Sequence, residues 1–187
     1  MKATAVFLLH LTFLSLFPRH LLLVAAACPD LPSMTVEDAC RTAAGTLLMY
    51  ELCKDALRDV SYPSNCVDLY ALVAAKRALA SYDDTARAAG DLLRGDGLTG
   101  DERGAYEACV AAYRDATGTM EAVAGEVVGC RFGEGLGQVY RDGVAQLERC
   151  RDKLMKLPSS PLYAMNLVDR NKAVLAYFLG RLLGIDQ

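Results

Sequence analysis

Hydrophobic residues along most of this chain recur at the spacing of a helix, and polar residues fall between them at the same period. The clearest segment runs from about Val67 to Arg94, where a polar stripe is surrounded mostly by Ala, Leu and Val. This pattern predicts one long helix with a wide buried face, which Gly95-Asp96-Gly97 ends. The polar stripe consists of Lys76, Asp83, Asp84, Arg87, Asp91 and Arg94.

Three further long helices are predicted downstream. Thr99 and Glu102 form a capping box at the start of the first, whose apolar positions then repeat at nearly coiled-coil spacing. After a glycine-rich break at 129–135, another helix is expected over about 136–154, and a last one over about 163–183. The residues expected to face inward on the last helix are Leu167, Val174, Leu175, Phe178 and Leu182.

A short helical hairpin is predicted before these helices. Thr35 is placed as the N-cap of a helix over 36–43, and a second arm is expected over 49–57. Four amphipathic helices joined by short loops favour an up-and-down antiparallel bundle. We therefore expect an all-α fold, with the helical hairpin over residues 35–62 and the four-helix bundle over residues 66–187.

The first 27 residues have the composition of a secretory signal peptide. A basic residue precedes an apolar run over 5–17, and three alanines stand at the expected cleavage site. The charge of Arg19 weighs against a membrane anchor, because a charge in the middle of a bilayer is costly. We expect residues 1–27 to be removed, residues 28–34 to form an N-terminal tail, and residues 35–187 to form one domain.

Removing the leader changes the chemistry that the chain offers. It takes away both histidines, His10 and His20, and histidine is the commonest general base and metal ligand near neutral pH. It also takes away two basic residues and no acidic ones, so the net charge of −3 becomes −5. A mildly acidic chain without a basic run or a Cys-x-x-Cys motif is expected to bind no nucleic acid and no metal. We expect neither enzymatic activity nor a cofactor, and no membrane contact in the mature form.

Cysteine positions then predict how the helices are joined. Cys109 and Cys150 lie at equal distances from the turn between their helices, both on inward stripes, so an antiparallel pair brings them to the same height. Cys40 and Cys53 are placed in the same way on the hairpin, whose helices are too short to persist alone. Loop closure makes each bridge worth about 3–4 kcal/mol.

The remaining cysteines pose a question of topology. Cys66 begins the first long helix and Cys130 follows the second, so an up-and-down bundle brings them to the same end. This placement predicts a third bridge, with two free thiols as the alternative. Cys28 is then left over in a tail expected to be disordered. We expect a monomer, with a disulfide-linked dimer through Cys28 as the alternative.

Short motifs around four of the cysteines and in the last helix carry a resemblance. They are Glu37-Asp38-Ala39-Cys40, Tyr50-Glu51-Leu52-Cys53, Tyr106-Glu107-Ala108-Cys109 with Tyr113, Gln146-Leu147-Glu148-Arg149-Cys150, and Asn171 with Leu175-Ala176-Tyr177-Phe178-Leu179. Over about residues 34–185 the chain resembles the plant invertase inhibitor and pectin methylesterase inhibitor family. The resemblance implies a four-helix bundle with an N-terminal hairpin, and it implies the two pairs Cys40–Cys53 and Cys109–Cys150.

Members of that family are secreted or vacuolar and inhibit carbohydrate-active enzymes. The resemblance therefore implies an inhibitor in the apoplast, rather than the vacuole, whose partner is a pectin methylesterase or an acid invertase. Invertase inhibitors carry Pro-Lys-Phe after the second bundle helix, and its Lys and Phe enter the target's active site. The matching loop here reads Cys130-Arg131-Phe132, which makes Arg131 and Phe132 the candidate target-binding residues. The alternative is that Phe132 covers the bundle end and Arg131 is solvated.

Two other classes of function remain as alternatives. One is a secreted helical recognition module that has lost inhibition, which the altered loop would explain. The other is a helical protein that binds lipids or small molecules, although the Cys-Cys and Cys-x-Cys motifs usual in such proteins are absent from this sequence.

Overall fold

The computed structural model describes residues 28–60 and 65–186. The predicted signal peptide at residues 1–27 lies outside the described residues. Six helices form over Val36–Ala43 (α1), Leu47–Leu57 (α2), Val67–Arg94 (α3), Gly100–Val128 (α4), Leu136–Leu154 (α5) and Pro161–Arg181 (α6). Among the described residues there is no strand, only an isolated bridge between Ser33 and Cys66. The expected all-α fold is confirmed.

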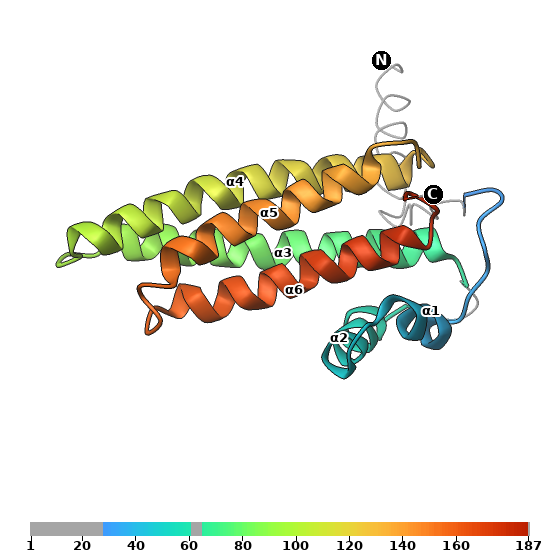
Figure 1. The fold of residues 1–187 in the computed structure, drawn as a ribbon, viewed down its shortest axis with the longest axis horizontal. Coiled ribbons are helices and arrows are strands. Elements are labelled where there is room, and N and C mark those ends of the chain that lie inside the picture. Colours follow the sequence, from blue (N-terminus) through green and yellow to red (C-terminus); the bar gives the residue numbers. More distant parts are fainter. Residues whose placement is uncertain (1–27, 61–64, 187) are drawn as a thin grey trace, which may run out of the picture.

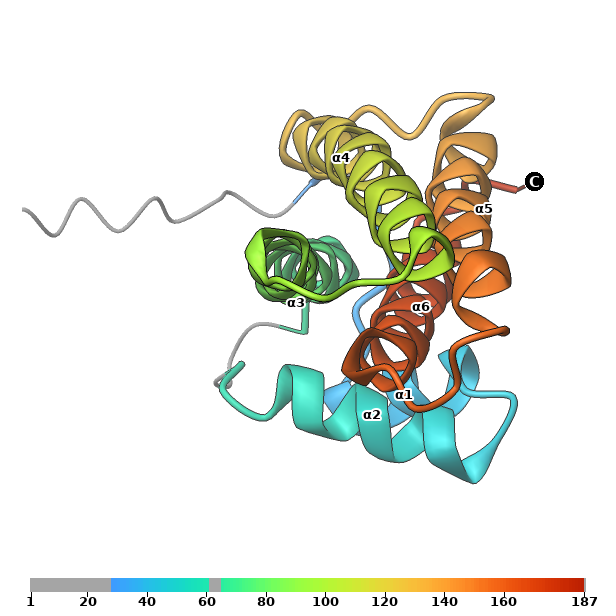
Figure 2. The same ribbon diagram turned by 90° about the vertical axis from the view of Figure 1, so that its left-hand side faces the viewer.

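The four long helices α3–α6 form an up-and-down bundle (Figure 1). Each packs against the next along the chain, and α6 returns to α3, which closes the ring. The hairpin of α1 and α2 lies on one side of the bundle, against α6 and α3 (Figure 2). None of the described helices is both long and apolar enough to cross a membrane.

The bundle core is built around aromatic side chains as well as small ones. Tyr82 and Tyr113 are fully buried and meet edge to face, with ring centroids 5.9 Å apart, an arrangement that aromatic pairs favour. Tyr140 of α5 lies directly on the backbone of α6 at Gly180, where a Cβ atom would stand 2.8 Å from its ring. The glycine therefore sets how closely α5 and α6 approach.

The inward face of α6 differs in part from the expected one. Leu175 is buried as predicted, and Val174, Phe178 and Leu182 are partly buried and pack against the core, whereas Leu167 is 37% exposed. The prediction followed the large apolar side chains, but the buried face of α6 includes two polar residues, and its other positions are partly small ones. The fully or nearly fully buried residues of α6 include Asn166, Asp169, Ala173, Leu175, Ala176 and Leu179.

A polar network at the centre of the bundle explains why Asn166 and Asp169 are buried. Asp169, 1% exposed, accepts hydrogen bonds from Ser81 Oγ, from Thr85 Oγ1 at 2.6 Å and from Tyr113 OH at 2.6 Å. Asn166 donates to Tyr113 OH at 3.2 Å and to a main-chain carbonyl of α5 at 3.1 Å. Burial raises the pKa of Asp169, and its three hydroxyl partners oppose that rise. The network thus joins α3, α4, α5 and α6.

Three disulfides staple the chain, and one differs from expectation. Cys40–Cys53 and Cys109–Cys150 are both present, as expected. The bridge predicted between Cys66 and Cys130 is absent, because Cys130 pairs with Cys28 and leaves Cys66 free. The topological argument placed Cys66 and Cys130 at the correct end of the bundle, but it treated the tail as disordered.

The segment that follows Cys28 is held against the start of α3. The amide of Cys28 donates to Asp68 Oδ2 at 2.9 Å, and the amide of Met34 donates to the carbonyl of Asn65 at 3.0 Å. Tyr70 OH donates to the carbonyl of Met34 at 2.9 Å. Cys28 is consequently buried, at 8% exposure, and lies where it reaches the end of α4.

Candidate functional site

The candidate target-binding residues lie in the α4–α5 loop at one end of the bundle, beside the C-terminal end of α6 (Figure 1). The loop begins with a Schellman motif, in which the amides of Cys130 and Arg131 donate to the carbonyls of Val127 and Glu126 at 3.1 and 2.9 Å. Cys130 has a φ of +53°, the left-handed conformation that glycine usually adopts at this position. A cysteine here costs backbone strain and supplies the bridge to Cys28.

Arg131 folds back along α4. Its Nε donates to Glu126 Oε2 at 2.8 Å and its Nη2 donates to Glu126 Oε1 at 3.0 Å, a two-pronged ion pair. This pair lowers the pKa of Glu126 and raises that of Arg131. The guanidinium also lies so close to Gly129 that a Cβ atom there would stand 2.2 Å from Arg131 Nη1. Arg131 is 62% exposed, so it is accessible but already paired.

Phe132 is half-buried and packs against the hydrophobic core at the bundle end. It borders a cleft of about 260 Å³ that Gln138, Arg141 and Asp186 also line. Its position matches the interpretation of Phe132 as a lid, whereas Arg131 is ion-paired and not simply solvated. A role for either residue in target binding stays a prediction.

A cluster of polar side chains beside this cleft was not found from the sequence. Asp186 accepts hydrogen bonds from Tyr177 OH at 2.5 Å and from Arg141 Nη1 at 3.1 Å. These contacts lower the pKa of Asp186, and the hydrogen bond from Tyr177 has the largest effect. Its Oδ1 lies against Gly137, where a Cβ atom would stand 2.0 Å away. No periodic pattern links α5 to a residue beyond α6, so the sequence held no signal for this contact.

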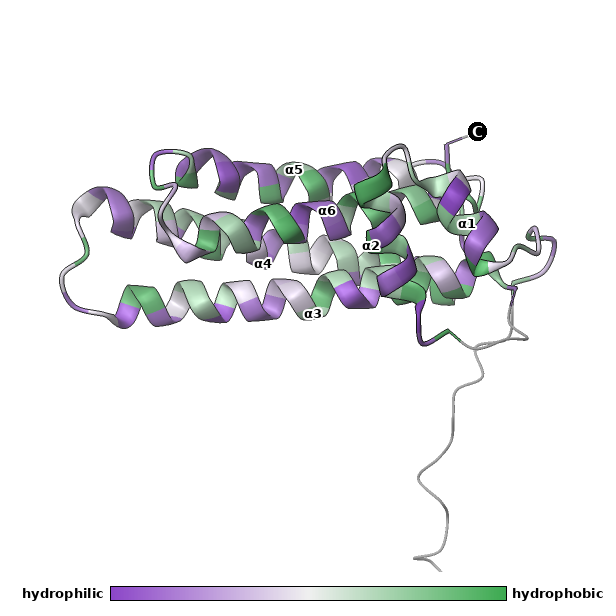
Figure 3. Cartoon of the chain, turned by 90° about the horizontal axis from the view of Figure 1, so that it is seen from below, coloured by the Kyte–Doolittle hydropathy of each residue, from purple (hydrophilic) through white to green (hydrophobic). Residues whose placement is uncertain are grey.

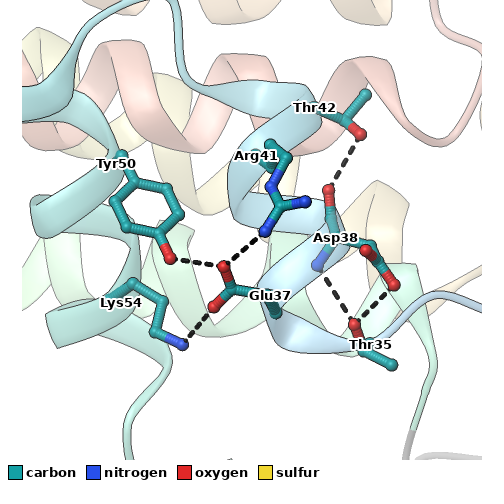
Figure 4. Close-up of polar contacts among 7 residues, drawn as sticks. All are labelled: Thr35, Glu37, Asp38, Arg41, Thr42, Tyr50 and Lys54. Carbon is teal, nitrogen blue, oxygen red and sulfur yellow. Dashed lines mark hydrogen bonds and ion pairs between the residues drawn. The ribbon is translucent and has the colours of Figure 1, made fainter.

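The hairpin carries a second polar cluster, which gives a structural reason for two of the motifs (Figure 4). Glu37 of α1 accepts hydrogen bonds from Tyr50 OH at 2.6 Å and Lys54 Nζ at 2.7 Å on α2, and from Arg41 Nη2 at 3.0 Å. These partners lower the pKa of Glu37 to about 2, and the hydrogen bond from Lys54 has the largest effect. The motif over residues 37–40 therefore contributes Glu37 to the cluster and Cys40 to the disulfide. The motif over residues 50–53 contributes Tyr50 and Cys53 in the same way.

The turn of the hairpin exposes apolar side chains. Leu47 is 75% exposed and Leu48 is 65% exposed. They belong to the first turn of α2, the start of which has hydrophobic colouring in Figure 3. The pattern predicts that this arm begins at Met49, which leaves Leu47 and Leu48 outside the helix, whereas α2 begins at Leu47.

Comparisons with known proteins bear on the fold. No model of a protein family matches this chain, and no curated protein matches it in sequence. Among solved structures, the chain is similar to a mutant form of a pectin methylesterase inhibitor from Arabidopsis, with a TM-score of 0.67 and 18% identity. The match covers 80% of this chain and 97% of that chain. The fold implied by the resemblance is confirmed: this chain has the fold of a pectin methylesterase inhibitor.

Proposed function

We propose that this chain is a secreted protein inhibitor of a pectin methylesterase, which binds the enzyme and covers its active site. The observation that carries the proposal is the similarity of fold, because it extends over 97% of a chain that is itself such an inhibitor. The short motifs around Cys40, Cys53, Cys109 and Cys150 point independently to the same family. Fold alone does not define function, so the proposal rests on both observations.

The α4–α5 loop favours a pectin methylesterase over an acid invertase as the partner. In the invertase inhibitors that the sequence resembles, a Lys and a Phe of this loop enter the target's active site. Here the guanidinium of Arg131 is already paired with Glu126, and Phe132 is half-buried at the bundle end. Freeing both for insertion would break a charge-assisted pair and expose apolar surface.

The disulfides support an extracellular site of action. Three bridges within one chain form and persist in oxidising compartments such as the extracellular space. Together with the predicted signal peptide, they favour the apoplast, where pectin and its esterases meet. We expect the mature inhibitor to act as a monomer, because Cys28 is paired within its own chain.

An inhibition assay tests the proposed function directly. Residues 28–187 are produced in oxidised form and mixed with a plant pectin methylesterase, and methanol release is followed at acidic and neutral pH. We expect inhibition at micromolar concentration or below, and a complex of the two proteins on size-exclusion chromatography. An acid invertase assayed in parallel should keep its activity.

Matched variants separate the loop from the rest of the surface. If the loop is not the inserting element, Arg131→Gln should inhibit pectin methylesterase as well as the unaltered chain does. Inhibition of invertase that Arg131→Gln abolishes would instead restore the invertase interpretation. No inhibition of either enzyme by a chain whose circular dichroism shows it to be folded would contradict the proposal.

A further inference from the structure

Three cysteines gather at one end of the bundle, and only two of them are bonded. Cys28 and Cys130 form a disulfide, and Cys66 is the free cysteine among the described residues. Cys66 is the N-cap residue of α3, and its side chain makes no capping hydrogen bond. The end of the bundle thus holds a disulfide and a thiol that has no capping role.

The free thiol belongs to a segment that runs beside the disulfide. The backbones of Ser33 and Cys66 form an isolated antiparallel bridge. Two residues beyond Cys66, Asp68 Oδ2 accepts the amide hydrogen of Cys28 at 2.9 Å. The start of α3 therefore contacts the N-terminal segment at Cys28 and at Ser33. Cys28 is also the residue to which Cys130 is bonded.

The three cysteine residues differ in exposure. Cys66 is half-buried and Cys130 is exposed, whereas Cys28 is 8% exposed. A thiolate attacks the disulfide sulfur to which it has access, and Cys130 is the more exposed of the two bonded cysteines. Cys130 also has a left-handed backbone conformation that is unfavourable for a residue with a Cβ atom, with a φ of +53°.

We propose that Cys66 is an exchange thiol that converts the Cys28–Cys130 disulfide into a Cys66–Cys130 disulfide. The thiolate of Cys66 attacks Cys130 Sγ, the new sulfur–sulfur bond forms, and the bond to Cys28 breaks. The electron pair of the broken bond leaves with Cys28 Sγ, which takes up the proton that Cys66 gave up. The number of disulfides is unchanged, so the step needs no oxidant or reductant.

The exchange changes what anchors the α4–α5 loop. In the present state Cys130 is tied to the N-terminal segment, which is held to the start of α3 by the Asp68 side chain and by the bridge between Ser33 and Cys66. After the exchange Cys130 is tied directly to the N-cap residue of α3, and the N-terminal segment loses its covalent attachment. The loop that bears Arg131 and Phe132 is thereby fixed to the bundle, while residues 28–34 keep only their noncovalent contacts with it.

Mapping of the free thiol tests the exchange, and it does not depend on the inhibition of any enzyme. Oxidised chain 28–187 is held at acidic pH, where thiols are protonated and exchange stops, and is then moved to mildly alkaline pH. Samples are alkylated over minutes to hours, the time of uncatalysed disulfide rearrangement. We expect label to appear on Cys28 in about a tenth of the molecules or more. This fraction corresponds to an isomer whose equilibrium population is no more than about tenfold below that of the starting isomer.

Two single variants make the result decisive. Cys66→Ser should keep the Cys28–Cys130 bridge and acquire no label at any pH. Cys28→Ser, treated with a glutathione redox buffer, should form the Cys66–Cys130 bridge and lose both free thiols. Label that stays on Cys66 alone, together with two free thiols in Cys28→Ser, would overturn the proposal, and so would label that moves to Cys130.

Discussion

The hairpin and the bundle of this chain are stabilised by different means. The hairpin has two short helices, a bridge across a separation of 13 residues, and a charged cluster around Glu37 at its surface. The bundle has four long helices, a buried network around Asp169 and one bridge between α4 and α5. A short helical pair depends on its disulfide because it buries too little surface, whereas the long helices add extensive packing to theirs.

Two carboxylates show the same contrast. Glu37 at the surface is surrounded by donors and cations, so its pKa falls to about 2. Asp169 in the core also receives three hydrogen bonds, yet burial dominates and its pKa rises. Hydrogen bonds to a carboxylate therefore do not by themselves decide whether its pKa rises or falls. Burial removes the water that stabilises the charged form, and this loss acts against the hydrogen bonds.

Removing the bridge of the bundle should have the largest effect. The double variant Cys109→Ala/Cys150→Ala opens a loop with a separation of 41 residues, and we expect the free energy of unfolding to fall by about 4 kcal/mol. Urea denaturation followed by circular dichroism measures this loss, which should appear in all the bundle helices together. Cys66→Ala should change it by less than about 1 kcal/mol, and a similar small change in the double variant would show that packing alone holds α4 to α5.

Removing the bridge of the hairpin should have a smaller and more local effect. We expect Cys40→Ala/Cys53→Ala to lose about 3 kcal/mol, expressed as faster amide hydrogen exchange in α1 and α2. Helices α3–α6 should keep their protection, because regions of low stability open separately from the core. Equal loss of protection in α3–α6 would mean that the hairpin is part of one cooperative unit with the bundle.

The buried carboxylate predicts a dependence on pH. An acid whose pKa is raised by folding favours the folded state most when it is protonated, and that advantage is lost as the pH rises through the folded pKa. Asp169→Asn should therefore lower the free energy of unfolding by about 2 kcal/mol below pH 4, and by less at neutral pH. Denaturation curves at several pH values measure the difference.

A control for this variant lies on the exposed face of α3. Asp83 is exposed, so Asp83→Asn should change the free energy of unfolding by no more than about 0.5 kcal/mol at any of these pH values. A cost of Asp169→Asn that grew with pH would show that hydrogen bonding outweighs burial at this site.

The surface carboxylate should give the smallest effect, with the opposite sign. A carboxyl whose pKa is lowered by folding stabilises the folded state above its ordinary pKa, and this contribution disappears as the pH falls through the folded value. For Glu37 the window lies between pH 4.5 and about 2. The protection factors of the amides in α1 and α2 should fall over that window in the unaltered chain, and Glu37→Gln should remove the change. A midpoint near 4.5 in a carbon-13 titration of Glu37 would disprove the cluster.

Local signals in the sequence were sufficient for most of the helices. The capping box of Thr99 and Glu102 is formed as predicted, and the helix predicted over Val67–Arg94 has those bounds. Such features depend on residues within one turn of each other. Part of the buried face of α6 was missed because Asn166 and Asp169 are buried by partners on three other helices, which no periodicity records.

The candidate site was less accessible to sequence reasoning. Cys28 lies in a segment without periodic pattern, so its attachment to Asp68 and Cys130 could not be anticipated. Likewise, the pairing of Arg131 with Glu126 depends on the Schellman motif that turns the loop back on α4. Contacts that require a particular loop conformation become visible only once the conformation is known.

The place of α6 in the bundle has a consequence for how the protein is made. It contacts α3, α5 and both hairpin helices, although it follows all of them in the chain. If the chain is secreted as we propose, it enters an oxidising compartment from its N-terminus and exposes every cysteine before α6 arrives, since all of them precede residue 161. The covalent frame can thus be complete while the groove that receives α6 is still open, which is when oxidative folding catalysts and chaperones would act on it.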